Sequence, residues 1–88
     1  MDSRTRVEDA LRASPYAGRA GAKDQPTIEN MANLLGALPV TQVIAPHASR
    51  LEVSFSRDLT PQEAFSLGTS LRASQASYGS QRLEAEWR

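Results

Sequence analysis

The sequence has no cysteine, one histidine and one tryptophan in 88 residues, and Lys23 is its only lysine. The absence of cysteine excludes a disulfide framework and a thiolate metal site, and a single histidine gives no basis for a histidine-bound zinc ion within one chain. No apolar run approaches the roughly 20 residues of a membrane-spanning helix, and no secretory signal is recognisable. We therefore predict a cytoplasmic protein that has no cofactor and no contact with a membrane.

The charges of the chain balance, because ten arginine and lysine residues stand against ten acidic ones. A neutral molecule has no overall field that would draw it to nucleic acid or to an anionic membrane. Nine of the ten basic residues are arginine, and together with the abundant alanine this bias is typical of GC-rich coding sequences and indicates a bacterial or phage source. At this length we expect a small core that buries only roughly 60–65% of the unfolded surface.

The strongest structural pattern lies between residues 50 and 87 and predicts a strand, a capped helix and a strand. Apolar and polar residues alternate over 51–56 and again over 83–87, which is typical of strands with one buried face. Between them, Thr60 and Glu63 have the spacing of a capping box, and Pro61 occupies the first helical position. The residues after this cap repeat at the spacing of one helical face: Ala64, Leu67, Gly68 and Leu71.

The first half of the chain predicts two helices and one further strand. A short helix is expected over 5–14, followed by a mobile linker over 16–25 that contains two glycines and no large aliphatic residue. A core helix follows from a cap at Thr27 to Leu38, and a β-branched run over 40–45 is expected to pair with 51–56 as an antiparallel hairpin. We therefore divide the chain into an N-terminal helix with a flexible Gly/Ala linker (1–25) and a single α+β domain (26–88).

The predicted fold class is α+β, with a three-stranded, mainly antiparallel sheet, two core helices on one of its faces and the extra N-terminal helix. The order α-β-β-α-β resembles the ferredoxin-like β-α-β-β-α-β topology without its first strand, and the helix after residue 60 is expected to form a crossover between the strands at 51–56 and 83–87. The missing strand leaves an edge or a gap beside the last strand. Such an edge can pair with a strand from another chain.

Two short motifs are compatible with nucleic-acid or phosphate binding but lack the residues around them. Gly18–Gly21 matches the Gly-x-x-Gly loop of KH domains, yet Asp24 and Pro26 follow where an apolar helix should begin, so a plain linker is the preferred interpretation. Gly21 to Lys23 lacks the spacing, the hydroxyl residue and the preceding strand of a phosphate-binding loop.

Catalytic residues are not predicted anywhere in the chain. His47 has no recognisable nucleophile and orienting carboxylate around it, and a solvent-exposed turn explains it more simply. Glu84 and Glu86 share one strand face, where neighbouring arginines make an exposed, ion-paired surface the simpler interpretation. The chain is therefore predicted not to be an enzyme.

By elimination, the sequence favours a small protein–protein interaction module, of the adaptor, regulator or inhibitor type, which can also self-associate as a homodimer. Binding is expected through the sheet edge and the N-terminal segment, where aromatic and arginine side chains are typical interface anchors: Trp87, Leu83, Tyr16, Arg12 and Arg19. Phe65 is a further aromatic candidate. The alternative is a nucleic-acid-binding accessory protein that uses the positive N-terminal segment: Arg4, Arg6, Arg12, Arg19 and Lys23.

Overall fold

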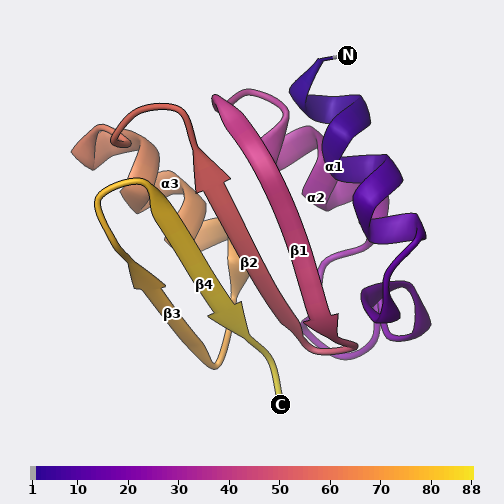
Figure 1. Ribbon diagram of the computed structural model, residues 1–88. Helices are drawn as coiled ribbons and strands as arrows, with labels where there is room; N and C mark the ends of the chain where they lie inside the picture. The colour runs from indigo at the N-terminus through magenta and orange to yellow at the C-terminus, as the bar shows by residue number, and fades with distance from the viewer. Residues whose placement is uncertain (1) are drawn as a thin grey trace.

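Three α-helices and a four-stranded antiparallel sheet make up the computed structural model, which describes residues 2–88 (Figure 1). In chain order the elements are α1 (Ser3–Arg12), the 3-10 helix η1 (Pro15–Gly18), α2 (Ile28–Leu35), β1 (Val40–His47), β2 (Arg50–Phe55), α3 (Pro61–Leu71), β3 (Gln75–Tyr78) and β4 (Arg82–Glu86). The strands lie in the order β1-β2-β4-β3, and each is antiparallel to its neighbours. The predicted α+β class is confirmed, but the sheet has one strand more than predicted.

The additional strand, β3, changes the connection of the sheet. Since β3 and β2 are both antiparallel to β4, they run in the same direction on either side of it. Helix α3 therefore crosses from β2 to β3, and the chain returns through a hairpin to place β4 between them. The predicted crossover from β2 directly to the last strand is wrong, and the order is not that of a ferredoxin-like fold lacking only its first strand.

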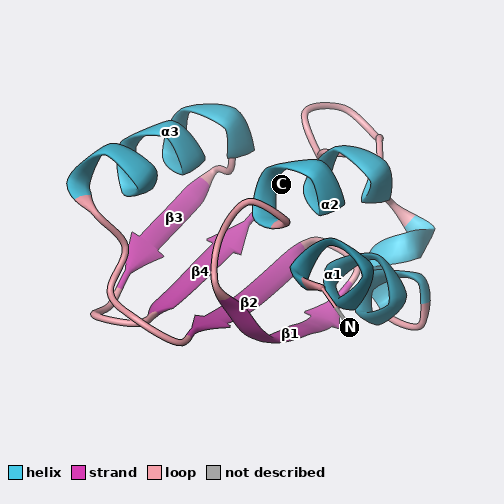
Figure 2. Ribbon diagram, turned by 90° about the horizontal axis from the view of Figure 1, so that it is seen from above, coloured by secondary structure: helices cyan, strands magenta, loops and turns pink. Residues whose placement is uncertain are grey.

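The helices cover one face of the sheet, with α3 at the β3 end and α1 and α2 at the β1 end (Figure 2). The predicted alternation in β2 and β4 is confirmed, because every second residue of these strands is buried beneath the helices. These residues pack against buried side chains of α2 and α3: Met31, Ala32, Leu35, Leu67 and Leu71. The opposite face of the sheet carries polar and charged side chains.

The N-terminal segment belongs to the same core as the rest of the molecule. Val7 and Leu11 of α1 are buried, and α1 contacts α2 and β1. Tyr16 of η1 is also buried, and its hydroxyl donates to the carbonyl of Pro26 at 2.7 Å. Residues 2–25 therefore contribute side chains to the core that residues 26–88 form; residue 1 lies outside the described residues.

Side-chain caps fix where the helices begin. The predicted capping box of α3 is present, with Thr60 Oγ1 accepting from the amide of Glu63 and Glu63 Oε1 accepting from the amide of Thr60. Thr27 caps α2 as expected, but α1 begins earlier than predicted, because Asp2 accepts from the amide of Thr5. Within residues 2–88, no helix combines the length and apolar character needed to cross a membrane.

Candidate functional site

The two edges of the sheet differ in how they are protected. Beside β1 lies α1, and Arg6 Nη1 donates to the carbonyl of Thr41 at 3.2 Å. The pairing of β1 with β2 shifts register twice, and Pro46 lies within the strand. A covering helix, bulges and proline are features that prevent a strand from pairing with another chain. The β1 edge therefore carries several features that oppose pairing with another chain.

The β3 edge has no bulge and no proline, and its short length is its one protective feature. All four residues of Gln75–Tyr78 are exposed, none is charged, and no further strand of the described chain lies beyond them. Natural sheet edges are commonly protected by charged residues, proline or a covering element. The β3 edge is therefore available for pairing.

The hydrogen bonds at both ends of β4 identify which backbone groups of β3 face outward. The amide of Gly79 donates to the carbonyl of Arg82 at 2.8 Å, whereas Trp87 donates to Ser49 on the β2 side. In an antiparallel ladder, successive residues bond alternately to the two sides. With the observed register, Gln75 and Ser77 bond to β4, so Ala76 and Tyr78 direct their N–H and C=O groups away from the sheet.

Helix α3 adds exposed aromatic surface beside this edge. Phe65 is 76% exposed and Tyr78 is 39% exposed. The Tyr78 ring packs against α3 at Gly68, where an added Cβ would lie 3.3 Å from the tyrosine hydroxyl. Phe65 precedes Gly68 by three residues and so lies on the same side of the helix. We call β3 together with Phe65 the β3 flank.

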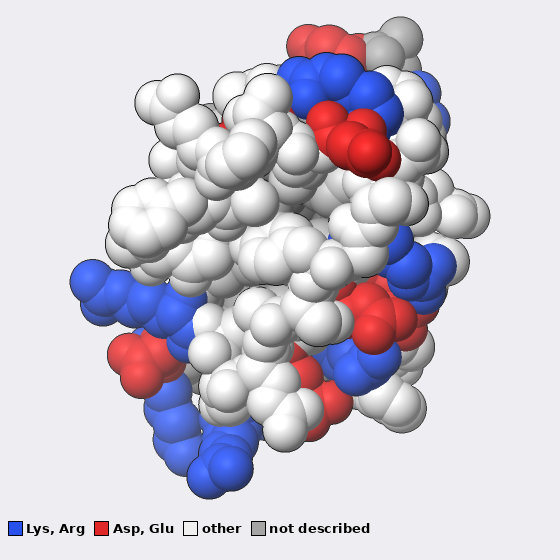
Figure 3. Space-filling view, turned by 90° about the vertical axis from the view of Figure 1, so that its left-hand side faces the viewer, with Lys and Arg blue, Asp and Glu red and all other residues white. Residues whose placement is uncertain are grey.

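The β3 flank has an uncharged centre (Figure 3). Viewed from the side on which α3 and β3 lie in Figure 1, the middle of the molecule shows uncharged side chains, and charged side chains lie around it. The pKa of the Tyr78 hydroxyl is raised by its partial burial, so this residue also remains neutral. The centre of the β3 flank therefore combines polar and apolar side chains and carries no net charge.

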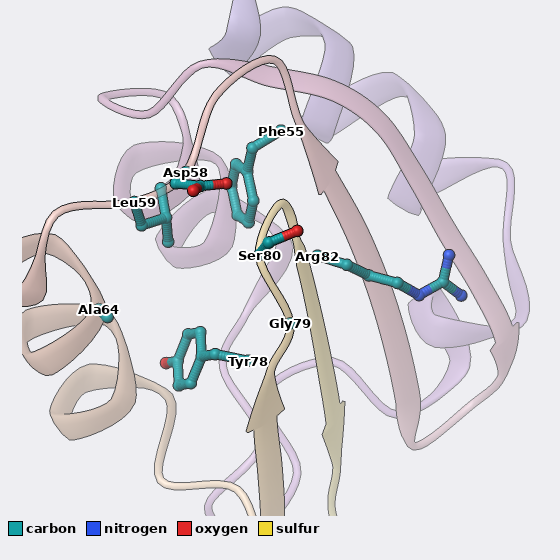
Figure 4. A pocket seen from close by; sticks show the side chains of 8 residues that line it. All are labelled: Phe55, Asp58, Leu59, Ala64, Tyr78, Gly79, Ser80 and Arg82. Carbon is teal, nitrogen blue, oxygen red and sulfur yellow. The ribbon is translucent and has the colours of Figure 1, made fainter.

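A shallow pocket of about 210 Å³ lies at one end of the β3 flank (Figure 4). In Figure 4 the Tyr78 ring forms its floor beside α3, and the turn into β4 closes the opposite side. Sites for small ligands usually enclose roughly 300–1,000 Å³. This pocket is therefore of a size for a single side chain of a partner. Its lining residues are Phe55, Asp58, Leu59, Ala64, Tyr78, Gly79, Ser80 and Arg82.

Three of the residues predicted to bind a partner lie in the core instead. Leu83 is buried in β4, which is an inner strand, and Tyr16 and Trp87 pack edge to face with their ring centroids 5.8 Å apart. Trp87 is only 4% exposed, and its Nε1 donates to the carbonyl of Leu71 at 3.0 Å. The last strand is therefore not the edge of the sheet, because β3 occupies that position.

The arginines of the N-terminal segment are largely engaged within the molecule. Arg4 bonds to Asn33 and Glu8, and Arg12 lies 3.5 Å from the other oxygen of Glu8. Arg19 donates to the carbonyl of Arg88 at 3.3 Å. Together with the Arg6 bond to β1, these contacts give four of the five predicted nucleic-acid-binding residues a partner within the molecule, while Lys23 lies in an exposed loop.

The open face of the sheet carries a network of ion pairs. Arg50 lies 3.4, 3.6 and 3.2 Å from carboxylate oxygens of Glu52, Glu84 and Glu86, and Arg82 contacts Glu52 and Glu84. The hydrogen bonds that Arg50 donates to Glu52 and Glu86, together with the negative charge of Glu84, raise the pKa of the Arg50 guanidinium. Each glutamate thus has an arginine partner, and this favours the interpretation of Glu84 and Glu86 as part of an exposed, ion-paired surface.

His47 and the acidic side chains are the remaining candidates for a metal site. His47 lies on β1 opposite Arg50, away from the pocket. Among residues 2–88, no three histidine or acidic side chains are placed to hold a metal ion together. Comparison of the chain with protein-family models, curated proteins and solved structures finds no match.

Proposed function

We propose that the protein is a small interaction module that binds a protein partner along the β3 flank. The observation that carries this proposal is the edge strand itself, with the outward backbone groups of Ala76 and Tyr78 on a charge-free, exposed surface. An added strand satisfies such groups by main-chain hydrogen bonds, and neighbouring pockets accept its side chains. Phe65 supplies apolar contact area directly beside the edge.

Features of the same surface argue against other ligands. The pocket is too small for most metabolites, and the uncharged centre of the flank offers no cations for the phosphates of a nucleic acid. The bacterial or phage source and the cytoplasmic location remain part of the proposal and rest on composition alone. We leave the N-terminal segment out of the proposed binding surface, because α1 packs beside β1 at the opposite end of the sheet and Arg6 donates to Thr41 there.

Capture from a native lysate by the tagged protein tests this function when the bait is varied at the edge. Ala76→Pro removes one outward N–H and leaves the bonds to β4 intact, whereas Ala76→Val keeps that N–H and serves as the control. We expect a protein partner that resists nuclease, is retained by Ala76→Val and is lost with Ala76→Pro. Recovery that disappears with nuclease, or that Ala76→Pro does not alter, would contradict the proposal.

A further inference from the structure

We infer that the partner of the β3 flank is a second copy of this chain, paired β3 to β3 across a two-fold axis. This inference rests on the proposed function and specifies its partner. Because β3 is the outermost strand of a four-stranded sheet (Figure 1), the pairing produces one continuous sheet that contains both copies of all four strands. All the helices then lie on the same face, since an axis perpendicular to the sheet preserves its two sides.

The register of this pairing follows from the outward groups. All outward backbone groups of two antiparallel β3 strands form hydrogen bonds when Ala76 of each copy lies opposite Tyr78 of the other. The two Ser77 residues then face each other at the two-fold axis. Every outward N–H of one copy then donates to an outward C=O of the other. Tyr78 also lies opposite a small residue on the helix-covered side, which leaves room for its ring.

Charge further favours a second copy as the partner. A two-fold axis places each central residue next to the same residue of the other copy. Two like charges would therefore repel each other if that residue were charged. Gln75–Tyr78 contains no charge, although 23% of the chain is charged. The nearest facing charge is Glu84, opposite Ser77 on β4, and its copy would be three strand spacings, about 14 Å, away. That separation exceeds the Debye length of about 8 Å in physiological salt.

The aromatic residue on α3 completes the contact. Helix α3 covers the sheet at its β3 end, so the two copies of α3 would lie next to each other on one face (Figure 2). Phe65 projects from the flank of α3 and is otherwise mostly exposed to solvent. A four-residue edge with one such aromatic per copy is a small interface, so we expect a dissociation constant of about 10–500 µM.

Charged substitutions of Ser77, the central residue of the pairing, test the inference on the full chain. The Ser77 residues of the two copies would face each other as a non-hydrogen-bonded pair, the arrangement in which opposing side chains are closest. Ser77→Lys and Ser77→Glu should each sediment as a monomer at concentrations where the unmodified chain and the control Ser77→Thr are dimers. An equimolar mixture of Ser77→Lys and Ser77→Glu should sediment as a dimer, because opposite charges then face each other.

Amide hydrogen exchange on the unmodified chain provides a second measurement that needs no variant to fold. The amides of Ala76 and Tyr78 should exchange at least tenfold more slowly above the dissociation constant than below it. Those of Gln75 and Ser77, which already bond to β4, should change much less. Exchange rates of Ala76 and Tyr78 that are independent of concentration would overturn the inference.

The outcomes separate this inference from the proposed function. A chain that stays monomeric to about 1 mM, far above the weakest affinity expected for such an interface, would rule out self-pairing. If the same monomer captured another protein in an Ala76→Pro-sensitive way, the proposed function would stand with a different partner. A dimer that neither single charge variant disrupts would show that another surface is used, and would also overturn the inference.

Discussion

At the scale of single residues, Trp87 shows how a terminal aromatic is fixed by groups distant in sequence. Its indole N–H donates to the carbonyl of Leu71, in the last turn of α3, where carbonyls lack partners within the helix. Its ring packs against Tyr16 from the other end of the chain. Alternation over 83–87 places Trp87 on the apolar face of its strand, but we expected a partner to cover it, because no local pattern indicates that Tyr16 completes its environment.

We expect Trp87→Phe to lower the free energy of unfolding by about 2 kcal/mol, because it leaves a small void and removes the bond to the Leu71 carbonyl. Urea denaturation followed by circular dichroism measures the change. Phe65→Ala is the control, since this mostly exposed residue should change stability by less than about 0.5 kcal/mol. Equal effects of the two substitutions would contradict the assignment of Trp87 to the core.

Glu63 combines the capping box with an ion pair and should make stability depend on pH. Hydrogen bonds from Arg57, and then from the amide of Thr60, lower the pKa of Glu63 from 4.5 to about 2. A depressed folded-state pKa stabilises the protein above the unfolded-state pKa, and this contribution is lost as the pH falls from about 5 towards 2.

The corresponding prediction is that Glu63→Gln is less stable than the unmodified protein at pH 7 and that the difference shrinks as the pH is lowered to 3. Denaturant midpoints across this range measure it, and Gln62→Glu provides a control at the neighbouring, unpaired position. A difference that is constant with pH would show that the charge of Glu63 contributes nothing. The capping box itself could be predicted from four consecutive residues, because both of its hydrogen bonds are local.

At the scale of elements, the contact between α1 and α2 depends on Gly36 at the end of α2. A Cβ at this position would lie 2.8 Å from Arg4 Cβ and 2.5 Å from the carbonyl oxygen of Ala32. The backbone conformation of Gly36 is helical, so its requirement is space and not a positive φ. Sequence alone identified Gly36 only as part of a helical run and could not show which element approaches it.

Gly36→Ala should therefore destabilise the protein by about 1–3 kcal/mol through displacement of α1. Gly18→Ala is the matched control, because a Cβ there has no neighbour within 4 Å. Thermal unfolding of the two variants in parallel measures the difference. Similar melting temperatures would mean that α1 accommodates the extra methyl group without strain.

The end of α3 offers a change in the opposite direction. Arg72 caps this helix in the left-handed conformation, with φ of 50°. Such a conformation strains residues that have a side chain and suits glycine. Arg72→Gly should raise the free energy of unfolding by about 1 kcal/mol, whereas Arg72→Ala should give no gain. Chemical denaturation of both variants distinguishes relief of strain from loss of the arginine side chain.

Strand β3 is the element that the sequence did not predict, although it decides the topology. Its four residues include Gln, Ala and Ser, which have little preference for strands, and all are exposed, so no buried alternation marks it. Gly79, in the hairpin between β3 and β4, is a residue typical of turns. Pairing with β4 supplies the stability that local propensity does not, so this edge strand, and with it the proposed binding surface, could be recognised only in the structure.

At the scale of the whole molecule, residues 2–25 share one core with the rest of the chain. The predicted division after residue 25 rests on the glycines of this segment, whereas the contacts of Tyr16 and of α1 with residues 26–88 are tertiary and leave no local pattern in the sequence. A chain this small has a thin stability margin. We expect residues 26–88 alone to lack a cooperative thermal transition, measured by circular dichroism. A sharp transition near that of the full chain would show that they form an independent domain.

The different protection of the two sheet edges also determines how far association can proceed. Strand pairing that used both edges would be heterologous and would continue into a fibre, because every added copy would present a new free strand. Here α1 packs beside β1 and Arg6 bonds to the Thr41 carbonyl, which disfavours addition at that edge. Pairing through β3 would use the other edge in both partners. In such a dimer, the helix on the far side of each copy would oppose further growth, so assembly would stop at two copies even at high concentration.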